Sequence, residues 1–97
     1  MKVTQNAYAG TLESSDAFVQ VMPLDKDVIE IELESSVEEI YGDAIRELIR
    51  NVLQKMGINS ARLVVQDKGA LDFVLQARVQ TAILRACGVK TPDWSTL

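Results

Sequence analysis

The sequence predicts a small α+β fold in which a sheet of three to four strands packs against two helices, in the order β-β-β-α-β-α. Short runs of β-branched residues predict the strands, and two longer segments with apolar residues at helical spacing predict the helices. Nothing repeats along the 97 residues, which suffice for one domain with one core. We therefore expect a single domain over residues 1–97, with an irregular tail at 89–97 that holds Trp94.

The first two strands are expected to form a hairpin. Residues 17–22 are rich in β-formers and are followed by a proline, and residues 7–13 can pair with them as the other arm. The connection then falls at residues 14–16, Ser-Ser-Asp, which favour turns because their side chains bond nearby backbone groups. Gly10 weakens the first arm, and it marks either a bulge or a close approach of two backbone segments.

The third strand is predicted at residues 28–34, where apolar and acidic side chains alternate. Its apolar positions should face the core, and its acidic positions should face solvent. A metal site or an acidic docking strip is the alternative for the acidic face. The core-facing positions are Ile29, Ile31 and Leu33, and the acidic positions are Glu30, Glu32 and Glu34.

The longest predicted element is a helix that begins near Ser36 and stops at Gly57. Ser36 and Glu39 have the spacing of a capping box, in which each side chain accepts a hydrogen bond from the backbone amide of the other residue. A broad apolar stripe follows and should pack on the sheet. Its members are Ile40, Tyr41, Ala44, Ile45, Leu48, Ile49, Val52, Leu53 and Met56.

A fourth strand is predicted at residues 61–66, and a second amphipathic helix at residues 71–86, which ends before Gly88. If the strands at 28–34 and 61–66 are parallel, the helix between them should make a right-handed crossover. Arg78 lies beside the apolar stripe of the second helix. Its stem can cover apolar surface while its guanidinium reaches a carboxylate or a phosphate.

Composition narrows the possible functions. The absence of histidine removes the commonest general base at neutral pH and every Ser-His or Cys-His nucleophile pair. Cys87 is the only cysteine, which excludes an intramolecular disulfide and predicts a core residue of a cytoplasmic protein. A net charge of −4 argues against nucleic acid as a partner, and no apolar run is long enough for a signal peptide or a membrane span. We expect protein or small-molecule partners and no metal site.

Three segments, taken together, carry a resemblance to a known family. The first is Ala-Gly-Thr-Leu-Glu-Ser at residues 9–14, with Asp16 two residues later. The second is Gly-Asp-Ala-Ile-Arg at residues 42–46, and the third is Asp-Lys-Gly-Ala-Leu-Asp at residues 67–72, which leads to Ala-Arg at residues 77–78. In order and spacing they resemble the acyl carrier protein that forms the gamma subunit of citrate lyase, over almost the whole chain.

The resemblance implies a non-catalytic carrier, which holds an acetyl or citryl group as a thioester on a long arm. The arm is 2'-(5''-phosphoribosyl)-3'-dephospho-CoA, joined through a phosphodiester to the serine that corresponds to Ser14. The implied partners are the alpha and beta subunits, which exchange and cleave the acyl group, and the transferase that attaches the arm. The family often has glycine after the modified serine, whereas here Ser15 supplies a competing hydroxyl. Candidates for support or docking are Asp16, Asp43, Arg46, Asp67, Lys68, Asp72 and Arg78.

Other functions remain open at the level of sequence. The carrier subunit of malonate decarboxylase resembles this system in using the same kind of arm. A small regulatory or assembly domain could bind a partner through the acidic strand face or through the tail near Trp94. A phosphopantetheine carrier is disfavoured, because the chain has no Asp-Ser-Leu motif and its serine lies between predicted strands.

Overall fold

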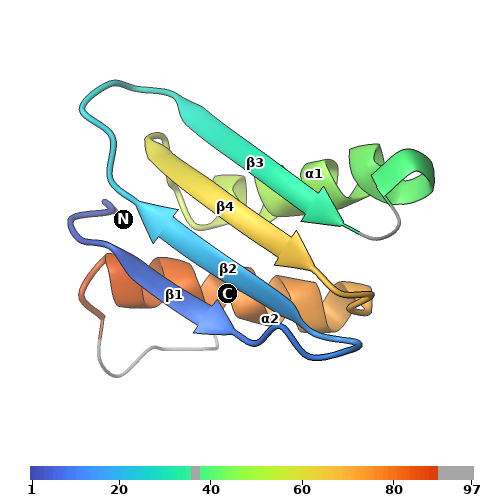
Figure 1. The fold of residues 1–97 in the computed structure, drawn as a ribbon. Coiled ribbons are helices and arrows are strands. Elements are labelled where there is room, and N and C mark those ends of the chain that lie inside the picture. The colour runs from blue at the N-terminus through green and yellow to red at the C-terminus, as the bar shows by residue number, and fades with distance from the viewer. Residues whose placement is uncertain (36–37, 90–97) are drawn as a thin grey trace.

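The computed structural model describes residues 1–35 and 38–89. These residues form four strands and two helices in the predicted order, which confirms the α+β fold class (Figure 1). The elements are β1 (Ala7–Gly10), β2 (Ala17–Met22), β3 (Ile29–Ser35), α1 (Glu38–Lys55), β4 (Ala61–Asp67) and α2 (Asp72–Ala86). Within the described ranges, neither helix is long and apolar enough to cross a membrane.

The strands form one sheet in the order β1-β2-β4-β3. β1 and β4 both run antiparallel to β2, whereas β3 and β4 are parallel, as strands joined by a helical crossover can be. Asp67 at the end of β4 pairs with Ala17 at the start of β2 and with Ser35 at the end of β3. These three paired positions mark one end of the sheet, which we call the Asp67 end.

Both helices cover the same face of the sheet (Figure 1). α2 lies across β1 and β2, and α1 packs against β3 and α2. Strand side chains alternate between the two faces, so every second residue of β2 and β4 enters the core. The largest fully buried side chains are Val19, Val21, Ile49, Leu53, Leu63, Val65, Leu75, Val79 and Ile83.

The edge strand β3 has apolar side chains on its core face and acidic side chains on its open face, as predicted. Leu33 is buried, and Ile29 and Ile31 are half-buried and pack against the core. On the open face, Arg62 of β4 forms ion pairs with Glu30 at 3.4 Å and with Glu32 at 3.2 Å. No group of acidic, histidine or cysteine residues within the described ranges could hold a metal ion. Two acidic side chains of the strip are therefore paired with a cation of the neighbouring strand.

The first hairpin arm is shorter than predicted. β1 ends at Gly10, and the connection to β2 occupies residues 11–16 and not 14–16 alone. Gly10 has a φ of +95°, a left-handed value that ends regular strand geometry. The expectation of a close backbone approach at Gly10 is confirmed, since a Cβ placed there would lie 1.8 Å from the carbonyl oxygen of Ala17.

The first turns of α1 also differ from prediction. Ile49, Val52 and Leu53 are buried, but Ile40 and Tyr41 from the same apolar stripe are exposed. In Figure 1 the start of α1 extends past the end of β3, so these turns have no sheet beneath them. Ser36 of the predicted capping box and residues 90–97 of the predicted tail lie outside the described residues.

Candidate functional site

Ser14 lies on a turn at the Asp67 end of the sheet. The Asp16 N–H donates to the carbonyl oxygen of Glu13 at 3.2 Å, which places Ser14 and Ser15 at the two central positions of a four-residue turn. Both serines are exposed. Ser15 has a φ of +63°, a conformation that normally favours glycine at the third position of a turn. The turn therefore presents the hydroxyl of Ser14 to solvent.

Asp16 is the anchor of this turn. The Arg78 guanidinium donates from Nε to Oδ1 at 2.8 Å and from its terminal nitrogen to Oδ2 at 2.9 Å. Asp16 also accepts from the Thr11 hydroxyl and from the Ala17 N–H, each at 2.7 Å. Its side chain is only 13% exposed. These contacts connect the hairpin loop to α2, in which Arg78 lies 62 residues after Asp16.

The charges of this pair stabilise each other. The hydrogen bonds from Arg78 hold the pKa of Asp16 well below its ordinary value, against the opposing effect of partial burial. The Thr11 hydroxyl and the Ala17 N–H lower that pKa further. In return, the Asp16 carboxylate raises the pKa of Arg78. Asp16 is therefore ionised at neutral pH, and its low pKa makes it poorly suited to accept a proton from Ser14.

Gly10 makes room for this contact. A Cβ at Gly10 would overlap the Ala17 carbonyl and would lie 3.2 Å from Cδ of Arg78. The missing side chain thus lets β1 pass close to the start of β2 while the Arg78 stem runs beside it. The glycine of the first family segment has a geometric role in fixing the loop.

The loop between β4 and α2 fixes the turn from its other side. The Ser15 N–H donates to the Lys68 carbonyl at 2.8 Å, and the Lys68 N–H donates to the Asp16 carbonyl at 2.9 Å. Asp67, which is buried, accepts from the Ser35 hydroxyl at 2.8 Å and from the Ala70 N–H at 2.9 Å. Asp67 therefore shapes the loop that holds the Ser14 turn.

The structure thus assembles most of the residues selected from the sequence. Ser14 lies on the turn, Asp16 and Arg78 form its ion pair, and Asp67 and Lys68 form the adjoining loop. The sequence predicts that the Arg78 guanidinium reaches a carboxylate or a phosphate, and in the structure it binds the carboxylate of Asp16. The remaining candidates lie on the helices, with Asp43 and Arg46 on α1 and Asp72 at the start of α2.

Sequence reasoning missed the role of Thr11. Its hydroxyl donates to Asp16 and accepts from the Glu13 N–H at 3.2 Å, so it links both ends of the loop. A threonine whose side chain bonds the backbone two residues on is a common turn motif. That spacing was the available signal, although it does not identify Asp16 as the second partner.

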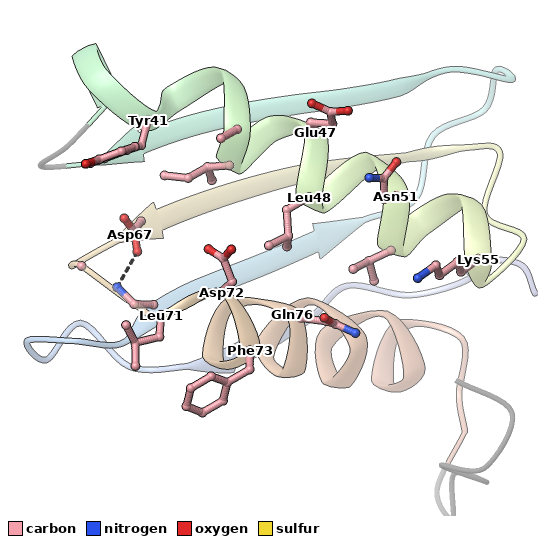
Figure 2. Close-up of a pocket in the computed structure, with 15 residues that line it drawn as sticks. Tyr41, Glu47, Leu48, Asn51, Lys55, Asp67, Leu71, Asp72, Phe73 and Gln76 are labelled. Carbon is pink, nitrogen blue, oxygen red and sulfur yellow. Dashed lines mark hydrogen bonds between the residues drawn. The ribbon is translucent and has the colours of Figure 1, made fainter.

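A groove of about 980 Å³ lies beside the loop between β4 and α2, and it separates α1 from the start of α2 (Figure 2). One side is formed by α1 from Tyr41 to Lys55, and the other by the segment from Gly69 to Gln76. Figure 2 places Asp67, with its bond to Ala70, at the end of the groove near Leu71. The walls of the groove come from two segments that are separated in the sequence, so the predicted apolar stripe of one helix did not reveal it.

The structure is that of a small α+β protein with an exposed serine on a well-fixed turn, and a carrier protein needs an accessible attachment point of this kind. Comparison with known proteins agrees with this class. Residues 4–86 match the model of a family of acyl carrier proteins, described as malonate decarboxylase delta subunit (MdcD).

Individual relatives narrow the class further. The chain is 46% identical over 97 residues to a citrate lyase acyl carrier protein of Vibrio cholerae serotype O1, covering 100% of this chain and 99% of the relative. It is 50% identical over 97 residues, with the same coverage, to the protein of that name from Haemophilus influenzae strain PittEE. The chain therefore belongs to the family of citrate lyase acyl carrier proteins.

Solved structures support the fold. A chain of a Pseudomonas malonate decarboxylase hetero-tetramer, crystallised with malonate, matches with a TM-score of 0.69 and 16% identity, covering 87% of this chain and 86% of that one. Homoserine kinase from Cytophaga hutchinsonii matches with a TM-score of 0.58 and 14% identity over 90% of this chain but 36% of the kinase. At these identities the likeness concerns the fold alone.

Proposed function

We propose that this chain is the acyl carrier subunit of citrate lyase and that Ser14 is the attachment point of its prosthetic group. The observation that carries the assignment is the exposed Ser14 hydroxyl at the tip of a turn fixed by Asp16 and by the Lys68 backbone. The names of the relatives support the role in citrate lyase. The group itself is 2'-(5''-phosphoribosyl)-3'-dephospho-CoA, linked through a phosphodiester.

The residues around Ser14 fit a covalent attachment. The hydroxyl is exposed, and no hydrogen bond within the described ranges engages it. When attached, the group supplies a thiol on a long arm, and the acyl group is carried as a thioester. The turn supplies a fixed base for that arm. Because tethering restricts the acyl group to the reach of the arm, it raises the effective concentration at the partner active sites, commonly into the millimolar range.

Ser14 does not activate itself. Of the two carboxylates in the turn, Asp16 is already bonded to Arg78, Thr11 and the Ala17 amide, and the chain contains no histidine. We therefore assign the base for the Ser14 proton to the attaching enzyme. We therefore propose a non-catalytic carrier, with the acyl chemistry performed by the alpha and beta subunits of the complex. We further propose that it acts in the cytoplasm, and we propose no nucleic-acid partner.

The two serines of the turn are in different situations. The position of Ser15 is defined by its backbone, which has a positive φ and donates its N–H to Lys68. The family's preference for glycine after the modified serine fits this requirement, because glycine adopts a positive φ without steric cost. Ser15 therefore corresponds to a turn position, and Ser14 to the position of attachment.

Intact mass spectrometry tests the assignment. Wild-type chain produced together with its attachment machinery should gain the mass of the prosthetic group. Ser14→Ala should abolish the gain, whereas the matched control Ser15→Ala should retain it, with peptide mapping placing the group on residue 14. An unmodified wild-type chain in an active native complex would contradict the proposal, and so would modification that persists in Ser14→Ala.

A malonate decarboxylase carrier is the second candidate, because the matching family model and one matching structure bear that name. The 46–50% identity to citrate lyase carriers, against 16% to the decarboxylase chain, favours the first candidate. Reconstitution with each set of partner subunits separates the two. A chain loaded with its group should restore citrate cleavage and should not support malonate decarboxylation.

A further inference from the structure

Large apolar side chains are exposed at the Asp67 end of the sheet, where the Ser14 turn lies. Among the described residues, five of the eight exposed large hydrophobic side chains belong to the elements that meet at the Asp67 end. In this fold, the hairpin loop, the end of β4 and the starts of both helices converge there (Figure 1). These five residues are Leu12, Ile40, Tyr41, Leu71 and Phe73.

Leu12 and Leu71 belong to the two loops that form the Ser14 turn and hold it in place. Leu12 precedes Ser14 by two residues in the same loop. The carbonyl of Lys68 accepts a hydrogen bond from the Ser15 N–H. Leu71 lies three residues after Lys68 and forms the N-cap of α2. Phe73 lies in the first turn of α2, and its ring points away from α1 (Figure 2). We call Leu12, Leu71 and Phe73 the Ser14 patch.

The fold gives no reason for this exposure. Val79 and Ile83 of the same helix are buried under the sheet, so α2 has a complete core face without Phe73. Phe73 remains 69% exposed although burial of a phenylalanine would contribute about 2 kcal/mol. Apolar residues that stay exposed together are typical of a protein-binding surface, and aromatic and aliphatic anchors dominate the energy of such surfaces.

We propose that the Ser14 patch is the docking surface for the enzyme that transfers the prosthetic group to Ser14. This inference rests on the attachment at Ser14. Ser14 lies on a short turn held to β4 and α2, so its Oγ cannot reach far from the surface. Reacting atoms must approach to about 3–3.5 Å, and the transferase must therefore cover the residues next to Ser14.

The citrate lyase subunits have a different geometric requirement. They act on the acyl group at the far end of the arm, so their active sites do not need to contact Leu12, Leu71 or Phe73. The patch is thus matched to the single reaction that takes place at the Ser14 oxygen itself. The Ser14 patch predicts that the transferase has an apolar rim around its active site. That active site also binds an anionic donor.

The reaction at this surface forms one bond and breaks one. The donor carries the phosphoribosyl dephospho-CoA group as an activated polyphosphate ester. Ser14 Oγ attacks the phosphorus next to the ribose, the Oγ–P bond forms, and the bond from that phosphorus to the leaving pyrophosphate breaks. The hydroxyl proton passes to a base of the transferase. No electrons are transferred to or from another reactant.

The test measures the rate of mass gain by purified apo chain, with its transferase and donor, as a function of chain concentration. Phe73→Ser and Leu71→Ser should each lower kcat/KM about tenfold, mainly through KM, since anchor residues commonly have effects of this size. Phe73→Leu should restore most of the rate. Tyr8→Ser is the matched control, because Tyr8 is 62% exposed on β1 and lies outside the patch, and it should react like wild type.

Loaded variants provide the second readout. After prolonged modification, Phe73→Ser and wild type should support citrate cleavage equally with the alpha and beta subunits. Equal modification rates for wild type, the patch variants and Tyr8→Ser would overturn the docking surface while leaving the attachment at Ser14 intact. A patch defect in citrate cleavage without one in modification would also overturn it. If wild-type chain gains no mass at Ser14, the proposed function itself fails.

Discussion

The guanidinium of Arg78 binds both carboxylate oxygens of Asp16, at 2.8 and 2.9 Å, and so ties the hairpin loop to the second helix. A bidentate pair of this kind fixes orientation as well as distance. Asp16 lies two residues after Ser14 in the sequence, whereas Arg78 lies in α2. The position of the attachment turn therefore depends on an interaction with a residue far away along the chain.

Replacing Arg78 with methionine should destabilise the protein by about 2 kcal/mol, because a carboxylate that is mostly buried loses two charge-assisted hydrogen bonds while the apolar stem remains. Urea unfolding monitored by circular dichroism measures this change. Asp16→Asn in the Arg78→Met background should recover part of the loss, since the unpaired charge is removed. Strictly additive effects of the two substitutions would show that the pair contributes no coupling energy.

The same pair predicts how stability responds to acid. The folded-state pKa of Asp16 lies below its ordinary value of 3.8, so the pair stabilises the fold fully above that pH. As the pH falls below 3.8, the unfolded chain takes up the proton first, and the stabilisation decreases until the folded-state pKa is passed. Unfolding free energies between pH 6 and about 2.5 should therefore fall more steeply for wild type than for Asp16→Asn. Parallel curves would exclude a lowered pKa for Asp16.

Gly10→Ala should destabilise the fold by about 3 kcal/mol, which combines an unfavourable positive φ with a steric overlap. The new Cβ would lie 1.8 Å from the Ala17 carbonyl oxygen, so β1 or the start of β2 must move. Gly69→Ala is the matched control, because Gly69 has a φ of +86° but no atom within 4 Å of its Cβ position. It should cost only about 1 kcal/mol in urea unfolding. Equal losses would remove the argument for a close approach at Gly10.

The order of strands and helices was predictable because it depends on local periodicity. The alternation at residues 28–34 and the helical spacing at residues 71–86 both reappear in the structure, with ends shifted by one residue. The family segments also selected Ser14, Asp16 and Arg78 as residues of interest. Local pattern and family resemblance thus gave the elements and most members of the site.

The contacts between those members were not predictable. Asp16 and Arg78 are 62 residues apart, and the chain has 10 basic residues that could have paired with any of its 14 acidic ones. The exposure of Ile40 and Tyr41 depends on where the sheet ends beneath α1, which helical spacing does not encode. The left-handed backbone at Ser15 runs against residue preference, and only the surrounding hydrogen bonds impose it.

That backbone conformation gives a further prediction for the attachment turn. Ser15→Gly should raise the unfolding free energy by about 0.5–1 kcal/mol, because glycine adopts a positive φ without the steric penalty of a Cβ. The stability gained from a less strained turn is partly offset, because glycine at residue 15 gives the unfolded chain more conformational entropy. Ser15→Val should lower stability, since a β-branched residue at this φ is strongly disfavoured. Both variants keep the Ser14 hydroxyl, so the group should still map to residue 14 in each. A stability order with Ser15→Val above Ser15→Gly would show that the turn does not hold residue 15 in the left-handed region.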